Sequence, residues 1–207
     1  KNIEKKVGQE THIYPTNIKF EKNTINILLG STLAGKTTLM QIMAGLDKPT
    51  SGEIHFNDQD VTGLKVQKRN VSMVYQQFIN NPNFSVFENI ASPLRILKVS
   101  EDEIKSKVGK IAELLKLSAM LNKKPSELSG GQQQAVAIAR ATAFNAKLVI
   151  MDEPTANLGA SAIEKVRETI LRLKTKGISV IIISHRLEDI LTVGDRLLVM
   201  KQGKAVG

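Results

Sequence analysis

The fold is decided by the stretch Gly30-Ser31-Thr32-Leu33-Ala34-Gly35-Lys36-Thr37-Thr38. It follows an apolar run at 25–29, which predicts a buried strand, and it opens a segment at 36–46 with apolar residues at helical spacing. A G-x-x-x-x-G-K-T sequence between a strand and a helix is typical of a phosphate-binding loop. Glycines let the backbone approach a phosphate, and the N–H groups of the loop and of the helix N-terminus attract the anion.

Two polar side chains in this stretch predict what it binds. Lys36 is long enough to reach β- and γ-phosphates, and the hydroxyl of Thr37 can ligate Mg²⁺. The alternative is a glycine-rich turn that matches by chance, and the strand before it and the helix after it argue against this. We therefore expect the chain to bind ATP or another nucleoside triphosphate together with Mg²⁺.

The composition is that of an ordinary globular protein. The chain has 207 residues, 42% of them hydrophobic and 24% charged, which fits one large domain or one domain with a subdomain. No apolar run approaches the roughly 18 residues needed to cross a bilayer. Cysteine is absent, so no disulfide framework exists, which fits a reducing compartment. Because Lys1 is not an initiator Met and no cap precedes Gly207, we expect both ends to be truncated.

The formal net charge of +9 is compatible with a nucleic-acid partner. However, the lysines are scattered along the chain, acidic residues interleave with those near 101–113, and aromatic residues make up only 4%. We therefore expect a solvated basic surface and no nucleic-acid interface. Attraction to anionic lipid headgroups, or to acidic loops of a partner, is the second interpretation.

The pattern along the chain predicts an α/β domain. Residues 11–29 alternate loosely around a turn at 21–23, which suggests an antiparallel hairpin that leads into the phosphate loop. Further strands are expected at 53–58, 71–76, 148–151, 180–183 and 196–200, and helices at 130–144 and 160–176. Alternating strands and helices predict a parallel sheet with helices on both faces.

A helical insert interrupts this alternation between Pro82 and Pro125, and we expect a helical subdomain over about 82–127. Within it, Ser100 and Glu103 have the spacing of a capping box, and apolar residues follow at helical intervals. The chain is thus predicted to be a single domain over 1–207 that carries one helical subdomain.

An acidic pair, Asp152 and Glu153, ends the apolar run at 148–151. Carboxylates at the carboxyl edge of a buried strand lie where ligands bind in open α/β sheets. Asp152 is therefore a candidate for holding Mg²⁺, and Glu153 for polarising an attacking water. The alternative is two solvated acids at a strand end, which the phosphate loop upstream disfavours.

A second anion site is predicted at Ser129-Gly130-Gly131-Gln132, because these residues open a helix. Taken alone, Ser-Gly-Gly is a common helix cap. One nucleotide does not need two such sites in one chain, and a head-to-tail dimer resolves this. The Ser129 segment of one protomer would cover the γ-phosphate that its partner holds.

With these motifs in this order, the whole chain resembles the ATP-binding subunit of ABC transporters. The resemblance implies a P-loop NTPase fold with a RecA-like parallel sheet, an antiparallel β subdomain and a helical insert. It identifies 30–38 as Walker A, 128–132 as the signature and Asp152 and Glu153 as Walker B. It also implies that Gln76, preferred over Gln77 because it follows Val-Tyr, touches Mg²⁺ or the attacking water, and that His185 is a switch histidine bonded to the γ-phosphate.

The sequence departs from the family pattern at several positions. Gly159 stands where the family has an acid that bonds across the dimer, and Ser31 stands where Pro is usual. An aromatic residue that would stack on adenine is not evident. Its expected position falls near Val7, and Tyr14 and His12 carry the nearby rings, so Tyr14 is a weak candidate.

Within the family, residues 30–89 are similar to ATPases of importers for sugars, polyols and glycerol phosphate. Residues 134–141 and 153–159 are similar to the ribose, xylose and fructose branch, in which Gly159 is usual. The resemblance implies a homodimer on the cytoplasmic face of the inner or plasma membrane, bound to integral membrane permease subunits and served by an extracytoplasmic substrate-binding protein. The alternatives are a soluble ABC ATPase acting on nucleic acid or ribosomes, and a nucleotide-binding regulator that barely hydrolyses.

Overall fold

The computed structural model of the chain describes residues 1–77, 79–144, 146–185 and 187–206, with the backbone alone at 67, 187, 189 and 190. Gly207 lies outside the described residues. Within these ranges, six strands form the main sheet in the order β10-β9-β3-β8-β7-β6. They are β3 (Ile25–Leu29), β6 (Val71–Val74), β7 (Leu148–Asp152), β8 (Ser179–Ser184), β9 (Arg196–Lys201) and β10 (Lys204–Ala205). All neighbouring pairs are parallel except β10 with β9, which confirms the predicted fold class.

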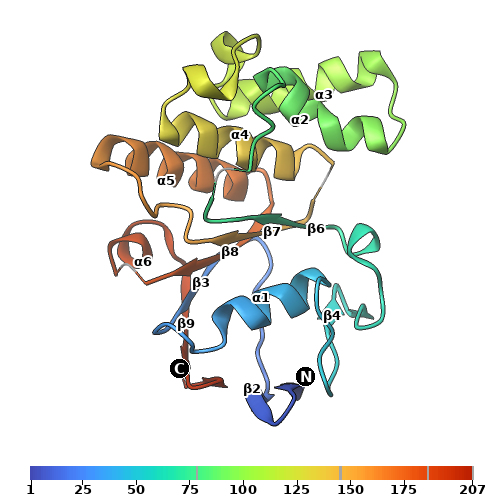
Figure 1. Ribbon diagram of the computed structural model, residues 1–207, viewed down its shortest axis with the longest axis vertical. Coiled ribbons are helices and arrows are strands. Elements are labelled where there is room, and N and C mark those ends of the chain that lie inside the picture. The colour runs from blue at the N-terminus through green and yellow to red at the C-terminus, as the bar shows by residue number, and fades with distance from the viewer. Residues whose placement is uncertain (78, 145, 186, 207) are drawn as a thin grey trace.

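Helices cover both faces of this sheet (Figure 1). Helix α1 (Lys36–Ala44) lies on one face, and α4 (Gly130–Thr142) and α5 (Ala160–Thr175) lie on the other. Strand residues alternate between the two resulting cores, as the period of two requires. In β7, for example, Ile150 packs on the α1 side, whereas Val149 packs on the side of α4 and α5.

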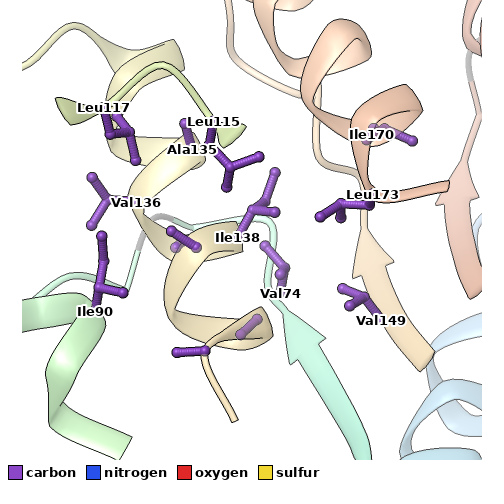
Figure 2. Packing of buried hydrophobic residues seen from close by; sticks show 14 of the residues in the cluster. Val74, Ile90, Leu115, Leu117, Ala135, Val136, Ile138, Val149, Ile170 and Leu173 are labelled. Atoms are coloured by element: carbon purple, nitrogen blue, oxygen red, sulfur yellow. The ribbon is translucent and has the colours of Figure 1, made fainter. Parts of the chain in front are cut away.

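The core on the α4 side is the larger one, and it continues into the helical segment (Figure 2). This segment holds α2 (Val86–Ile96), α3 (Glu101–Leu114) and the short 3₁₀ helices η2 (Ser118–Met120) and η3 (Pro125–Glu127). Its buried side chains pack against α4, where Ile90 and Leu117 flank Val136. Ser85 and Ser100 accept hydrogen bonds from the third backbone N–H of α2 and α3, and thereby start these helices.

The N-terminal hairpin was predicted with the wrong partner. Strand β2 (Glu10–Thr16) pairs antiparallel with β1 (Ile3–Val7), and it does not pair with β3, which belongs to the main sheet. Alternation shows which face of a strand is buried but not which strand lies beside it. The turn-like residue Asn23 does have a positive φ, but it connects two different sheets.

The other short elements lie at the edges of the domain. Strands β4 (His55–Phe56) and β5 (Gln59–Asp60) form a small hairpin where the sequence predicted a single strand. The 3₁₀ helix η1 (Val66–Lys68) precedes β6, and α6 (Leu187–Val193) follows β8. Among the described residues, no helix combines the length and the apolar character needed to cross a bilayer.

A buried arginine fixes the far end of α1. Arg69 is 2% exposed, and its guanidinium donates to the carbonyls of Ile42 at 2.8 Å and Thr62 at 2.9 Å, among others. Cation donors at a helix C-terminus satisfy its last carbonyls and oppose the negative end of its dipole. Arg69 therefore holds α1, and with it the phosphate loop, against the β4–β5 region.

Candidate functional site

The predicted site residues gather at one edge of the main sheet, because the strands that precede them are parallel neighbours. The order β3-β8-β7-β6 places the phosphate loop, His185, the Asp152–Glu153 pair and Gln76 one after another at the carboxyl ends of these strands. This is the edge where open α/β sheets bind ligands.

The glycines of the phosphate loop are required by close packing. A Cβ on Gly30 would overlap the backbone carbonyl oxygen of Met200 in β9. Gly35 has a φ of +92°, and a Cβ there would lie 2.9 Å from the carbonyl oxygen of His12 in β2. The loop thus packs closely between β9 and β2. Because Gly35 has no side chain, the first N–H groups of α1 have no side-chain cap.

Lys36 is held inside this loop. Its side chain is largely buried, and Nζ donates to the carbonyl oxygens of Gly30 at 2.7 Å and Ser31 at 2.8 Å. An ammonium group has three N–H donors, so a third remains for a phosphate oxygen. The rest of the loop is partly open: Ser31, Thr32, Leu33 and Thr37 are exposed, Thr38 is half-buried and Ala34 is buried.

Asp152 is the last residue of β7, and Glu153 follows it directly. Burial raises the pKa of Asp152, and the nearby Glu153 raises it further, while the charge of Lys36 acts in the opposite direction. Glu153 has a φ of +46°, and its N–H donates to the carbonyl of Ile183 in β8 at 2.8 Å. A residue with a Cβ in this left-handed region carries backbone strain of about 1–3 kcal/mol.

Glu153 is paired with His185. Nδ1 of His185 lies 2.7 Å from Oε2 of Glu153, and the His185 side chain is 62% exposed against 21% for Glu153. The structure therefore joins the predicted base and the predicted switch histidine directly, with the imidazole on the open side of the carboxylate.

The residues at this edge fit a magnesium ion. The hydroxyl of Thr37 and the carboxylate of Asp152 are hard oxygen donors, which Mg²⁺ prefers. A divalent cation would also favour the ionised form of Asp152, which burial and Glu153 disfavour. In the described ranges, no group of three His, Cys, Asp or Glu residues forms a metal cage. Mg²⁺ commonly relies on phosphates and water for its remaining ligands.

Gln76 lies two residues past the end of β6 and is exposed, as is Gln77. The segment that continues from it is tied to the helical side, because Nδ2 of Asn80 donates to the carbonyl of Gln133 in α4 at 2.9 Å. No pattern in the sequence predicted this junction. The same is true of the side-chain amide of Gln134, which is fully buried and has no hydrogen-bond partner among the described residues.

The Ser129–Gln132 segment is an intact helix cap. The Ser129 side chain accepts a hydrogen bond from the N–H of Gln132 at 3.4 Å, and Oε1 of Gln132 accepts one from the N–H of Ser129 at 2.9 Å. Gly131 is buried, and a Cβ on it would lie 3.0 Å from Cβ of Ala162 in α5. Within the described ranges, no hydrogen bond or ion pair joins this segment to the phosphate loop. Helices α4 and α1 lie on opposite faces of the sheet (Figure 1).

Tyr14, the weak candidate for an adenine contact, is 43% exposed, and its ring centroid lies 4.8 Å from Nζ of Lys204. Its strand is linked to the phosphate loop through Gly203. The N–H of Tyr14 donates to the carbonyl of Gly203, and the N–H of Gly203 donates to the carbonyl of Ala34 in the loop. Val7 is 51% exposed at the end of β1.

Two curated relatives have different named cargoes. The chain is 37% identical over 204 residues to the Fe(3+) ions import ATP-binding protein FbpC of Vibrio cholerae, which covers 98% of this chain and 58% of the relative. It is 38% identical over 214 residues to the glucose import ATP-binding protein GlcV of Saccharolobus solfataricus, covering 100% of this chain and 61% of the relative. The chain thus spans about three-fifths of the length of these relatives.

Solved structures match the fold throughout. The ADP conformation of an ATP-binding cassette of an ABC transporter aligns with a TM-score of 0.90 and 31% identity, over 100% of this chain and 87% of that one. A dimeric post-hydrolysis state of an ATP-binding cassette, bound to ADP and Pi, aligns with a TM-score of 0.84 and 30% identity, over 100% and 95%. The sequence profile described as "ABC transporter" matches residues 13–156. The chain belongs to the ABC transporter family.

Proposed function

We propose that this chain is the ATP-hydrolysing motor of an ABC importer. The observation that carries the proposal is the grouping of a buried, loop-bonded Lys36 with the paired Glu153 and His185 at one sheet edge. The same edge holds the oxygen donors that fit Mg²⁺, so binding and hydrolysis of ATP can occur at one place.

Each residue has a definite task in this proposal. Lys36 binds the β- and γ-phosphate oxygens and neutralises their charge. Glu153 accepts a proton from the attacking water, and His185 orients Glu153 and bonds the γ-phosphate. Thr37 and Asp152 would hold Mg²⁺, together with Gln76, and the ion would supply further charge neutralisation on the phosphates.

The active state is proposed to be a dimer of two copies. The Ser129–Gln132 cap lies on the α4 side of the sheet, so it would complete the site of a second copy better than that of its own chain. In such an arrangement each ATP lies between one phosphate loop and the partner's cap. The dimeric relative with ADP and Pi supports this proposal.

The membrane partner and the cargo follow from the resemblance to importers. We propose that a permease docks near the segment after Gln76, which connects the site to α4 through Asn80. This would place the chain on the cytoplasmic face of the inner or plasma membrane, with a binding protein delivering the cargo. A carbohydrate is the proposed cargo class, although the named cargoes of the relatives include iron as well as glucose.

Two measurements test the proposal. The chain should release phosphate from MgATP, and the release should stop when EDTA removes Mg²⁺. If the chain binds ATP but releases no phosphate, it is a nucleotide-binding regulator and not a motor. Co-purification with an integral membrane subunit should exceed recovery of DNA or RNA. Salt-sensitive nucleic-acid recovery without a membrane subunit would instead favour the soluble alternative that the net charge of +9 allows.

A further inference from the structure

A cavity of about 230 Å³ lies where the segment after α3 meets the helices α4 and α5. Its walls come from 115–120, from the first turns of α4 and from the middle of α5, and not from the phosphate loop or from the residues that end β7. Pockets for drug-sized ligands measure roughly 300–1,000 Å³, so this cavity has room for a smaller molecule.

The buried part of the cavity lining is mainly apolar. Leu115, Leu117 and Ala135 are all buried, and they lie together where the segment after α3 passes α4 (Figure 2). Thr169 of α5 is also buried, and its hydroxyl donates to the carbonyl of Lys165 at 2.8 Å. Because that donor is already used, the buried lining offers water few partners and favours an apolar group.

The charged residues around the cavity are mainly basic. Lys116, Lys165 and Arg172 line it together with one acidic residue, Glu168. Oε2 of Glu168 lies 3.0 Å from Nζ of Lys116 and 3.3 Å from the guanidinium of Arg172. Within the described ranges, the ammonium group of Lys165 has no hydrogen bond or ion pair, so it is available to an anion.

One face of α5 supplies most of this charge. Lys165, Glu168 and Arg172 are three and four residues apart, so their side chains follow one another along the helix. The guanidinium of Arg172 also donates to the carbonyl of Leu114 at the end of α3, at 2.9 Å. The two walls are thus joined by bonds at the rim, while the space between them stays open.

We propose that this cavity binds a small organic anion with an apolar body, such as a medium-chain carboxylate. The apolar body lies on the buried lining, and the anionic group pairs with Lys165 and Lys116 at the rim. Gly131 and Gln132 of the cap also line the cavity, so an occupant contacts the first turn of α4. All of these residues belong to one copy of the chain, so the site does not depend on the proposed hydrolysis or on the proposed dimer.

Isothermal titration calorimetry of the full chain without nucleotide tests the site, with octanoate as the probe. Octanoate should bind once per chain. Acetate, which has the charge alone, and octanol, which has the apolar body alone, should each bind at least tenfold more weakly. If acetate binds as tightly as octanoate, the cavity takes an adventitious ion only, and if octanol does, the basic rim has no role. Either result overturns the proposal, as does the absence of octanoate binding.

Two charge reversals on α5 locate the bound probe. Lys165→Glu should weaken octanoate binding at least tenfold, because the reversed charge repels the carboxylate. Lys176→Glu is the matched control, since Lys176 is an exposed lysine beside a second hollow at the other end of α5, and it should leave the affinity unchanged. A native affinity for Lys165→Glu, or a tenfold loss for Lys176→Glu, would overturn the assignment to this cavity.

Lys36→Ala separates this proposal from the proposed function. Because Lys36 does not line the cavity, this variant should bind octanoate like the native chain even where its affinity for ATP is lost. Loss of octanoate binding in Lys36→Ala would place the probe in the phosphate loop and overturn the proposed site.

Discussion

The helices α1 and α4 both begin at glycine-containing segments that we propose as anion sites, yet their first turns are built differently. Helix α1 starts at Gly35 in a left-handed conformation with no side-chain cap, so its first N–H groups are available to an anion. Helix α4 starts at Ser129 with a complete capping box, in which Ser129 and Gln132 satisfy each other's N–H groups. We infer that the start of α1 can bind a phosphate through its free N–H groups, whereas the start of α4 is already ordered by its own capping bonds.

The charged groups are distributed just as unequally. Lys36, Asp152, Glu153 and His185 all lie at the edge that carries the phosphate loop, whereas the cap itself contributes no charged side chain. We infer that the loop determines nucleotide affinity and hydrolysis, and that the cap determines closure of the dimer.

The largest effect should come from Glu153→Gln. Loss of a general base lowers a rate by about 10²–10⁴-fold, and ATP affinity should persist because this carboxylate acts on water and not on the phosphates. Phosphate release and equilibrium ATP binding measure the two effects separately. Glu164→Gln, on the outer side of α5, is the matched control, and a native hydrolysis rate for Glu153→Gln would refute the assignment of the base.

Lys36→Ala should weaken ATP binding by about 10–100-fold, since a hydrogen bond to a charged group contributes about 1.5–3 kcal/mol. Isothermal titration calorimetry measures this loss. Lys22→Ala, in an exposed turn, should bind ATP like the native chain. Equal ATP affinities for Lys36→Ala and the native chain would refute the proposal that Lys36 binds the phosphates of ATP.

Ser129→Ala tests the other side of the comparison. It should lower the free energy of unfolding by about 1 kcal/mol through loss of the N-cap, and it should weaken the ATP-dependent dimer. Binding of ATP to the monomer should not change, because in the proposed dimer the cap contacts the partner's nucleotide. A loss of monomer affinity as large as that of Lys36→Ala would instead place the cap in its own chain's site.

A smaller effect, on the stability of the fold, is expected at Asp195, which is bonded to the start of β3. Asp195 accepts a hydrogen bond from the N–H of Ile25 at 2.8 Å and pairs with Lys174. Although burial acts to raise the pKa of Asp195, these two bonds outweigh it and lower the pKa overall. A lowered pKa in the folded state means that this stabilisation is present above the unfolded pKa of about 3.9, and that it is lost as the pH falls through the lower, folded value.

Asp195→Asn should therefore lower stability by about 1 kcal/mol near neutral pH. The difference in melting temperature between the native chain and Asp195→Asn should narrow below about pH 4. Thermal unfolding between pH 3 and pH 7 measures this, and a difference that stays constant across the range would contradict the role of the ionised carboxylate.

The sequence was informative where structure depends on neighbours along the chain. The phosphate loop, the Ser129 cap and the acids that end β7 are all local patterns, and the parallel order of the strands then brings loop and acids to one edge. The helix predicted at 36–46 ends at Ala44, where Gly45 takes the left-handed conformation that stops it.

Features that depend on contacts between residues far apart in the chain could not be predicted from the sequence. The strand paired with β2 was predicted wrongly, because alternation carries no information on pairing. Burial of Arg69 beneath the end of α1 has no local signal, since an arginine is usually exposed. The same holds for Asn80 and Gln134, whose positions follow from the packing of the segment after β6 against α4.

The proposal that each ATP site combines the phosphate loop of one copy with the cap of the other is tested most directly by mixing two inactive variants. Lys36→Ala lacks a working loop, and Ser129→Arg lacks a working cap, so neither should release phosphate alone. In a mixed dimer, one of the two sites joins an intact loop to an intact cap. We predict that mixing restores phosphate release to a substantial fraction of the native rate, and a mixture as inactive as its components would contradict a site shared between two copies.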